Sequence, residues 1–254
     1  FRRLRKLKVP LPARHVSPGN MKKLLTSKGI KDEKCFLLMG EKLISEFLET
    51  KNPFFKIKNV ISFDEAEFPL LQTQIKLKKE LFDELDVLGT HSPMLVLEYS
   101  ELNEPSLLEA PEGLEIISPL GDPKNLGALS RSALGFGASK LILTKESCHP
   151  YLPHAIKASA GAILNIPIFY TTKDTSELPL VGENYALNLH GQKVHDLTWP
   201  KNLRLWVGEE GPGLKLSMDQ KRKIKMITIP TTGIESLNAT VSTSIALWEW
   251  KKRN

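Results

Sequence analysis

A late segment of the chain combines residue types that can bind a polar ligand. An apolar run ends at Pro230, a polar turn with Gly233 follows, and Ser236-Leu237-Asn238 precedes a helical pattern. Proline ends a strand ladder, glycine permits a tight turn, and Ser or Asn at a helix start accepts orphan backbone N–H groups. The pattern predicts a rigid strand–loop–helix with backbone donors and short polar side chains. Taken alone, such a segment is also common as plain structure.

A second segment, GEEGPG at Gly208–Gly213, is rich in glycine directly after an apolar run. Glycine has no Cβ, so the backbone of such a loop can approach a ligand closely. A nucleoside-triphosphate site is disfavoured, because the loop lacks the Lys-Ser/Thr pair of a P-loop and its two carboxylates would repel phosphate. Gly135–Gly137 does not fit a dinucleotide-binding fingerprint, because it ends a predicted helix where that fingerprint begins one.

A third segment, DPKNLGALSRSALGFG at Asp122–Gly137, places Asn125 and Arg131 on a predicted helix that follows an apolar strand. A guanidinium is essentially always protonated, so Arg131 suits positioning a phosphate and stabilising charge better than removing a proton. The alternative for Arg131 is an ordinary arginine on a helix surface.

Strands and helices alternate around these segments. Strands are expected at 114–120, 141–144, 166–170, 185–189, 203–208 and 225–229, and helices at 125–134, 154–160 and 238–252. Continuous apolar strands are buried on both faces and indicate an α/β fold with a mostly parallel sheet. Ligands of such sheets bind outside the carboxyl ends of the strands. Each polar segment follows a strand at that end, so one shared site is predicted.

The first part of the chain predicts a small α/β/α sandwich. Helices are expected at 20–28, 41–50 and 77–86, and strands at 35–40, 59–63 and 94–99. The acidic stretch Glu101–Gly113 contains two prolines, lacks periodicity and separates the halves. We predict four parts: a basic N-terminal arm at 1–16, a first domain at 17–103, a linker at 104–112 and a second domain at 113–254.

Taken in order, the three polar segments resemble the TrmH (SpoU) branch of the SPOUT RNA methyltransferases. The family motifs run as Asn-Leu-Gly-x-x-x-Arg, Gly-x-Glu-Gly-x-Gly, and Ile-Pro followed by Ser-Leu-Asn, and KASAGAILNIPIF at Lys157–Phe169 also resembles the family. The resemblance extends from Leu114 to about Lys252. It implies a C-terminal SPOUT α/β domain with a trefoil knot, a small N-terminal ribosomal-protein-like RNA-binding domain, and S-adenosyl-L-methionine as cofactor.

The resemblance assigns roles residue by residue. Residues expected to act in catalysis are Asn125, Arg131, Glu210, Ser236 and Asn238. Residues expected to hold the cofactor, mainly through the backbone, are Leu189, Gly191, Gly208, Gly213, Ile229 and Leu237. The methyl group of this cofactor is already activated by the sulfonium. The protein must therefore mainly place a ribose hydroxyl in line, help remove its proton and hold an adenine.

Two positions depart from the family pattern. The loop from Ile229 to Ser236 is one residue shorter than in many relatives. Glu209 stands where relatives often carry Ser, Asn or Ala, so it adds a charge that either attracts a sulfonium or faces water.

The composition indicates a folded protein with a polyanionic partner. The chain has 254 residues, of which 41% are hydrophobic and 25% charged, which is enough to bury a core. Its net charge of +6 favours a polyanionic partner, since each phosphate that is neutralised releases counterions, and the resemblance implies that this partner is RNA. The basic residues near the start form either a disordered tail or an arm that contacts phosphates: Arg2, Arg3, Arg5, Lys6 and Lys8.

Neither a membrane segment nor a metal site is expected. No apolar stretch approaches the roughly 20 residues that cross a bilayer. Cys35 and Cys148 lie far apart, which favours free thiols in a reducing compartment. Cys148, His149 and His154 lack a fourth ligand for a structural zinc. We expect a cytoplasmic protein, and a mitochondrial homologue is also compatible with the sequence.

The predicted function is transfer of a methyl group from S-adenosyl-L-methionine to a ribose 2′-hydroxyl of ribosomal RNA, or alternatively of transfer RNA, by a homodimer. One alternative is a non-catalytic RNA-binding or ribosome-assembly factor with the same fold. Another is an enzyme that methylates a base nitrogen. Cofactor binding tests the first alternative, and product analysis tests the second.

Overall fold

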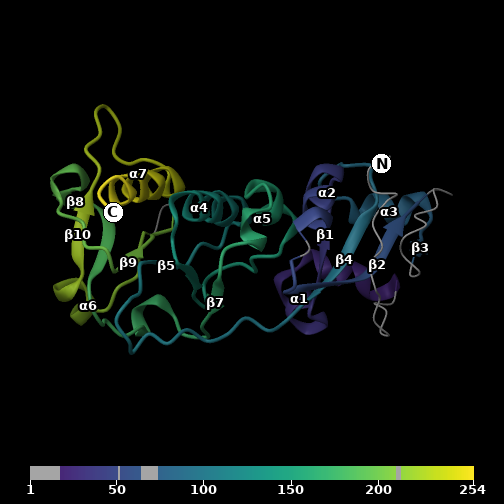
Figure 1. Ribbon diagram of the computed structural model, residues 1–254, viewed down its shortest axis with the longest axis horizontal. Coiled ribbons are helices and arrows are strands. Elements are labelled where there is room, and N and C mark those ends of the chain that lie inside the picture. Colours follow the sequence, from purple (N-terminus) through teal and green to yellow (C-terminus); the bar gives the residue numbers. More distant parts are fainter. Residues whose placement is uncertain (1–17, 51, 64–73, 210–212) are drawn as a thin grey trace. The chain divides into compact units, whose positions relative to one another are not determined.

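The computed structural model describes residues 18–50, 52–63, 74–209 and 213–254 (Figure 1). They form two compact units. Unit 1 runs to Glu101 and also includes His149–Gly161, whereas unit 2 comprises Leu102–Cys148 and Ala162–Asn254. The domain boundaries read from the sequence stay a prediction, and 149–161 belongs to unit 1 although it comes late in the chain. No helix in these described ranges is long and apolar enough to cross a bilayer.

Unit 1 contains a mixed four-stranded sheet in the order β1-β4-β2-β3. Its elements are η2 (Pro18–Leu25), α1 (Ser27–Glu33), β1 (Cys35–Leu38), α2 (Glu41–Thr50), β2 (Phe55–Ser62), β3 (Gln74–Lys76), α3 (Lys79–Leu85), β4 (Met94–Tyr99) and α5 (Pro153–Ala158). The helix expected at 20–28 is divided, because Thr26 leaves the helical conformation and its side chain caps α1 by accepting from the Gly29 N–H at 3.1 Å. The short strand β3 was not predicted.

Both faces of this sheet are covered, as the alternation of side chains along a strand requires. Cys35 and Leu37 of β1 lie in a core cluster with Phe82 of α3. Phe36, which points the other way, stacks on Tyr151 with ring centroids 4.7 Å apart. The segment 149–161 therefore completes the core of unit 1.

Unit 2 is built on a six-stranded sheet in the order β10-β8-β9-β5-β6-β7. Its elements are β5 (Leu114–Ser118), α4 (Pro123–Phe136), β6 (Lys140–Leu143), η3 (Ala162–Leu164), β7 (Ile168–Tyr170), η4 (Thr175–Glu177), β8 (Asn184–Lys193), η5 (Val194–Asp196), β9 (Leu203–Trp206), α6 (Met218–Lys223), β10 (Lys225–Thr228) and α7 (Ala239–Lys251). Every strand pairing is parallel, so the predicted mostly parallel sheet is confirmed. The short helix α6 was not predicted.

Helices α4 and α7 lie side by side over this sheet (Figure 1). The hydroxyls of Ser132 and Ser244 are 2.7 Å apart between the two helices. On the other face, Trp206 packs in a core cluster that includes Leu107 and Ile224. Because apolar side chains are buried on both faces, the strands carry the continuous apolar runs seen in the sequence.

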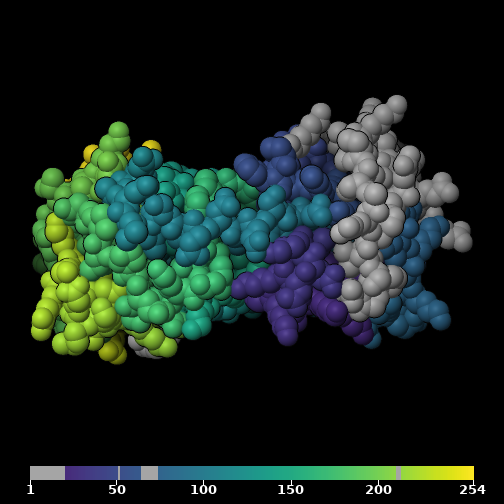
Figure 2. Space-filling view, turned by 90° about the horizontal axis from the view of Figure 1, so that it is seen from below, coloured from purple at the N-terminus to yellow at the C-terminus, as the bar shows by residue number. Residues whose placement is uncertain are grey.

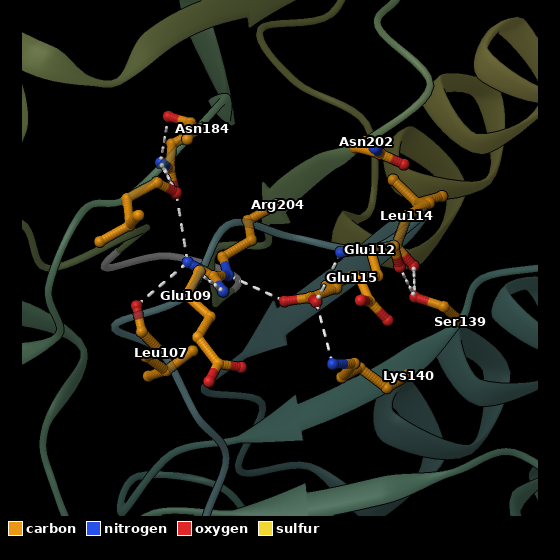
Figure 3. Close-up of polar contacts among 12 residues, drawn as sticks. Leu107, Glu109, Glu112, Leu114, Glu115, Ser139, Lys140, Asn184, Asn202 and Arg204 are labelled. Atoms are coloured by element: carbon orange, nitrogen blue, oxygen red, sulfur yellow. Dashed lines mark hydrogen bonds and ion pairs between the residues drawn. The ribbon is translucent and has the colours of Figure 1, made fainter.

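A buried ionic network lies at the amino ends of three neighbouring strands (Figure 3). Arg204 of β9 donates from Nε to Glu115 of β5 at 2.8 Å, and Lys140 of β6 lies 3.0 Å from the same carboxylate. The guanidinium also donates to the carbonyls of Leu107 and Glu109. Burial raises the pKa of Glu115, but hydrogen bonds from Arg204 and Lys140 outweigh it, and the pKa is lowered.

This network and a separate backbone hydrogen bond hold the segment 102–112 against the rest of unit 2. The backbone N–H of Glu112 donates to Glu115 at 3.1 Å, and the Asn103 carbonyl accepts from the Tyr170 N–H at 3.0 Å. Figure 2 shows this segment in blue to teal on the surface of unit 2. The stretch that reads as a linker is therefore held in place over much of its length.

The pairing of β8 with β10 changes register and depends on a glycine. Met226 pairs with Ala186, whereas Ile227 pairs with Gln192, so 187–191 is inserted between two paired stretches. A Cβ on Gly191 would lie 2.4 Å from the Met226 carbonyl oxygen and 2.8 Å from the Ile227 nitrogen. These are backbone atoms, so no side chain can move aside to make room.

We expect Gly191→Ala to destabilise unit 2 by about 1–3 kcal/mol, because the added methyl must push β8 and β10 apart. Gly135→Ala is the matched control, since its Cβ would meet nothing within 4 Å. Gly135 lies in the last turn of α4, so that change should alter the stability by less than about 1 kcal/mol. Urea unfolding measures both variants, and equal stabilities would contradict the close approach at Gly191.

A histidine lies in the aromatic core of unit 1. His149 is 3% exposed, and its Nδ1 accepts from the Tyr151 backbone N–H at 3.2 Å. The proton therefore lies on Nε2, which is 2.9 Å from the Tyr99 hydroxyl oxygen. Burial, with smaller contributions from Lys31 and Lys34, lowers the pKa of His149 from 6.5 to about 3.

This histidine should make folding stability fall as the pH falls from about 6.5 toward 3. Across that window the unfolded chain binds a proton that the folded state excludes, which costs about 1.4 kcal/mol per pH unit. In His149→Gln this dependence is absent. The difference in unfolding free energy between wild type and variant should therefore shrink with falling pH. His91→Gln, which changes an exposed histidine of the same unit, should leave that dependence intact. A pH-independent difference for His149→Gln would refute the assignment.

Candidate functional site

The three polar segments leave the same edge of one sheet. Strands β10, β8, β9 and β5 are consecutive neighbours and all run parallel. Their carboxyl ends therefore lie next to one another, at the edge where ligands of α/β sheets bind. Ten of the eleven predicted site residues lie in these strands, in the loops that follow them or on the helices that those loops lead into. Glu210, the eleventh, lies outside the described residues.

The exit of β5 is ordered by a helix cap. Asp122 caps α4, and its carboxylate accepts from the Asn125 N–H at 2.8 Å, with Pro123 in the first turn. This arrangement places Asn125, which is partly buried, in that first turn. Arg131 lies further along α4 with an exposed side chain, and it has no hydrogen bond or ion pair within the described ranges.

The exit of β9 is a narrow turn. The Val207 N–H donates to the Ile117 carbonyl at 3.0 Å and continues the pairing with β5. A Cβ on Gly208 would lie 3.1 Å from the Leu214 nitrogen, so a larger residue would press on the returning backbone. Glu209 and Gly213 exchange two backbone hydrogen bonds of 3.3 and 3.1 Å, and Gly213 has a φ of 67°.

Glu209 has a definite partner. Its carboxylate accepts from the Gly121 N–H with a distance of 3.0 Å between Oε1 and the nitrogen. Gly121 directly precedes the capping residue of α4. The side chain thus joins the exit of β9 to the exit of β5, an arrangement that the sequence alone did not predict.

The predicted residues of β8 lie in the inserted stretch of that strand. Leu189 is 48% exposed, and its carbonyl accepts from the Thr228 hydroxyl of β10 at 3.1 Å. The Asn188 side chain accepts from the His190 N–H at 3.1 Å and folds this stretch back on itself. Together with the close approach at Gly191, these bonds fix the exits of β8 and β10 against each other.

The exit of β10 leads into α7. Asn238 caps this helix, and its side-chain oxygen accepts from the Thr240 and Val241 N–H groups at 2.9 and 3.3 Å. Ile229 and Leu237 are partly buried, whereas the Ser236 side chain is exposed. The predicted loop and helix start are therefore present, with Asn238 in a structural role as the cap.

A carboxylate at the neighbouring exit of β6 supports the same edge. Glu146 accepts hydrogen bonds from the Thr144 hydroxyl and, at 2.9 Å each, from the backbone N–H and hydroxyl of Thr175. Burial raises the pKa of Glu146, but these hydrogen bonds outweigh it and the pKa is lowered. Within the described parts of the chain, no three His, Cys, Asp or Glu side chains are grouped to hold a metal.

This arrangement suits a ligand that is held largely by the backbone. The glycines allow close approach, and exposed Leu189 offers an apolar surface. Arg131 adds an exposed cation on α4. Asp122 and Glu209 lie in segments that the sequence predicted for this site, but Gly121 and its hydrogen bond to Glu209 were not predicted. Asp122 carried a local signal for its role as the cap, since an Asp before Pro is typical of a helix start.

Comparison with known proteins relates the chain to RNA methyltransferases. The model of the SpoU rRNA Methylase family matches residues 116–248. The 23S rRNA (guanosine(2553)-2′-O)-methyltransferase RlmP of Bacillus subtilis is 26% identical and aligns with 93% of this chain and 96% of its own length. A Syntrophobacter fumaroxidans protein named ribosomal RNA small subunit methyltransferase G 2 is 33% identical over 92% of this chain. The chain spans only 47% of that relative and 65% of the 30% identical RlmB of Yersinia pestis.

Solved structures show the same fold. The SpoU methyltransferase AviRb from Streptomyces viridochromogenes, in complex with AdoMet, matches with a TM-score of 0.77 at 21% identity over 94% of this chain and 98% of its own. An AdoMet-bound rRNA methyltransferase from Sinorhizobium meliloti matches with a TM-score of 0.72 at 19% identity over 95% and 98% of the two chains. The family match covers more than half of the chain, including all three polar segments. The chain belongs to the SpoU rRNA methylase family.

Proposed function

We propose that the protein transfers a methyl group from S-adenosyl-L-methionine to a ribose 2′-hydroxyl of RNA. The observation that carries this proposal is the convergence of the three family segments at the carboxyl ends of adjacent parallel strands. Ribosomal RNA is the favoured substrate, because RlmP and RlmB are named as 2′-O-methyltransferases of 23S rRNA. Transfer RNA is the second candidate.

The residues at this edge fit such a cofactor. Gly208 and Gly191 keep the backbone clear where a Cβ would collide, and the exits of β8, β9 and β10 present backbone donors and acceptors. Exposed Leu189 can cover an adenine face. When bound, the cofactor supplies an activated methyl group, so the protein's own task is orientation and charge. Gly213, Ile229 and Leu237 would contribute to the same pocket.

We assign Arg131 to the RNA that accepts the methyl group. Its exposed guanidinium would bind an RNA phosphate and stabilise negative charge as the hydroxyl loses its proton. Asn125, Ser236 and Glu210 would hold the ribose beside it, and Asn238 would fix the start of α7. None of these roles requires the guanidinium to act as a base.

The proposal extends to RNA binding by unit 1, a knot in unit 2, a homodimer and a cytoplasmic location. Unit 1 would grip RNA as a ribosomal-protein-like domain, and the last strands of unit 2 would form a trefoil knot. A second copy of the chain would cover apolar side chains that stand exposed on α4 and α7, namely Leu134, Val241 and Trp248. The free thiols of Cys35 and Cys148 suit the reducing cytoplasm.

Arg131→Ala should lower the rate of methyl transfer on the order of a hundredfold, because the variant lacks the cation that we assign to the RNA phosphate. Cofactor affinity should be unchanged. Arg131→Lys should retain part of the activity, since a point charge replaces the planar fork. Lys201→Ala, which removes an exposed cation elsewhere in unit 2, is the control. Resistance of the product to alkaline cleavage identifies a 2′-O-methyl group. Turnover near wild type in Arg131→Ala would exclude this role.

Calorimetry should detect S-adenosyl-L-methionine at micromolar affinity, with one site per chain or per half of a dimer. Gly208→Ala should weaken binding, because its Cβ would lie 3.1 Å from the Leu214 nitrogen and displace the loop slightly, and Gly135→Ala should preserve it. If neither this cofactor nor S-adenosylhomocysteine bound, even with RNA present, the non-catalytic assembly factor would become the better explanation. Methylation at a base nitrogen would appear as a product that remains sensitive to alkali.

A further inference from the structure

We infer that Glu209 is a positioning residue that clamps the β5–α4 loop to the β9 loop and so aligns the acceptor side of the site with the cofactor side. This inference rests on the proposed methyl transfer. The position belongs to the glycine-rich motif, but it is one that the family pattern leaves variable.

The clamp joins two neighbouring strands just beyond the point where their backbone pairing ends. Ile117 of β5 pairs with Trp206 of β9, and the Val207 N–H still donates to the Ile117 carbonyl at 3.0 Å. Past Val207 the ladder stops, and the next link between the two exits is the 3.0 Å bond from the Gly121 N–H to the Glu209 carboxylate.

Both ends of this bond are fixed. The Glu209 backbone is held by its two hydrogen bonds with Gly213. Gly121 directly precedes Asp122, the cap of α4, and a Cβ at Gly121 would lie only 3.1 Å from Glu209 Oε1. The carboxylate therefore fits against a glycine and the start of a helix, where a negative charge is favourable.

The clamp determines where α4 begins. Asn125 lies in the first turn of α4 and Arg131 lies further along the same helix, so a shift of the loop at Gly121 moves both residues together. On the other side, Gly208 and Gly213 form the loop that we assign to the cofactor. The hydrogen bond from the Gly121 N–H to the Glu209 side chain fixes the spacing of these two loops.

The alternative is that the Glu209 charge attracts the sulfonium directly. That role requires the charge but not the bond to Gly121, whereas a clamp requires the bond but not the charge. Two conservative variants separate these requirements. Glu209→Gln keeps an oxygen at the same reach without charge, and Glu209→Asp keeps the charge on a side chain that is too short to reach Gly121.

The test uses the full chain with Glu209→Gln, Glu209→Asp, Glu209→Ala and, as a control, Glu104→Ala at an exposed position of unit 2. Amide hydrogen exchange of Gly121 is the direct measurement. The Gly121 amide should exchange about tenfold faster in Glu209→Asp and Glu209→Ala than in wild type. In Glu209→Gln and in the control Glu104→Ala its exchange should be close to wild type. Methyl transfer should follow the same order, with kcat falling about tenfold in Asp and Ala and KM for RNA nearly unchanged.

Two results would overturn the clamp. One is a Gly121 exchange rate in Glu209→Ala within about twofold of wild type. The other is weaker binding of S-adenosyl-L-methionine but not of uncharged S-adenosylhomocysteine in Gln and Ala, with Asp unaffected, which would assign the charge to the sulfonium. The exchange measurement needs no cofactor or RNA. A protein without methyl transfer would therefore refute the proposed function and still test the clamp.

Discussion

The fully buried Arg204 imposes the strongest constraint on unit 2, because a guanidinium with five donors must find acceptors once water is excluded. Glu115 supplies the countercharge and accepts from Nε, and the carbonyls of Leu107, Glu109 and Val181 accept three further hydrogen bonds. Removing one partner of such a buried pair typically costs about 3–5 kcal/mol. The network therefore fixes the amino ends of β5, β6 and β9 and the preceding segment as one body.

The opposite edge of the sheet, at the carboxyl ends of the strands, is held by a different kind of interaction. Among the described residues of that edge there is no buried charge pair, and the loops are held by close backbone approach at glycines, by helix caps and by carboxylates that accept from N–H groups. Gly191 permits a backbone approach that any Cβ would prevent, and Gly208 leaves room for the Leu214 backbone, which a Cβ would crowd. Asp122 and Asn238 accept from the first N–H groups of α4 and α7. Loops held in this way keep defined positions yet leave polar backbone groups at the edge. A rigid amino end supports a carboxyl end that can face a ligand.

The sequence predicted the parts of this structure that depend on local pattern. The apolar strands of unit 2, the cap at Asn238 and the glycine loop all have periodicity or residue types that act over a few positions. It did not predict that 149–161 belongs to unit 1, because the Phe36–Tyr151 stacking joins residues more than a hundred positions apart. The bond between Glu209 and Gly121 is non-local in the same way. Short elements such as β3 and α6 contain too few residues to show a period.

The motif residues that the structure describes fall into two groups, those with a structural role in the fold and those without one. Gly191 and Gly208 are needed for strand and loop packing, and Asn238 is needed to start α7, so a non-catalytic protein with this fold would require them equally. Their presence therefore does not discriminate between an enzyme and an assembly factor. Arg131 and Ser236 differ, because both side chains are exposed and neither has a hydrogen-bond partner in the described ranges. In the described part of the chain no contact calls for an arginine or a serine at these two positions, so they support the proposed chemistry most directly.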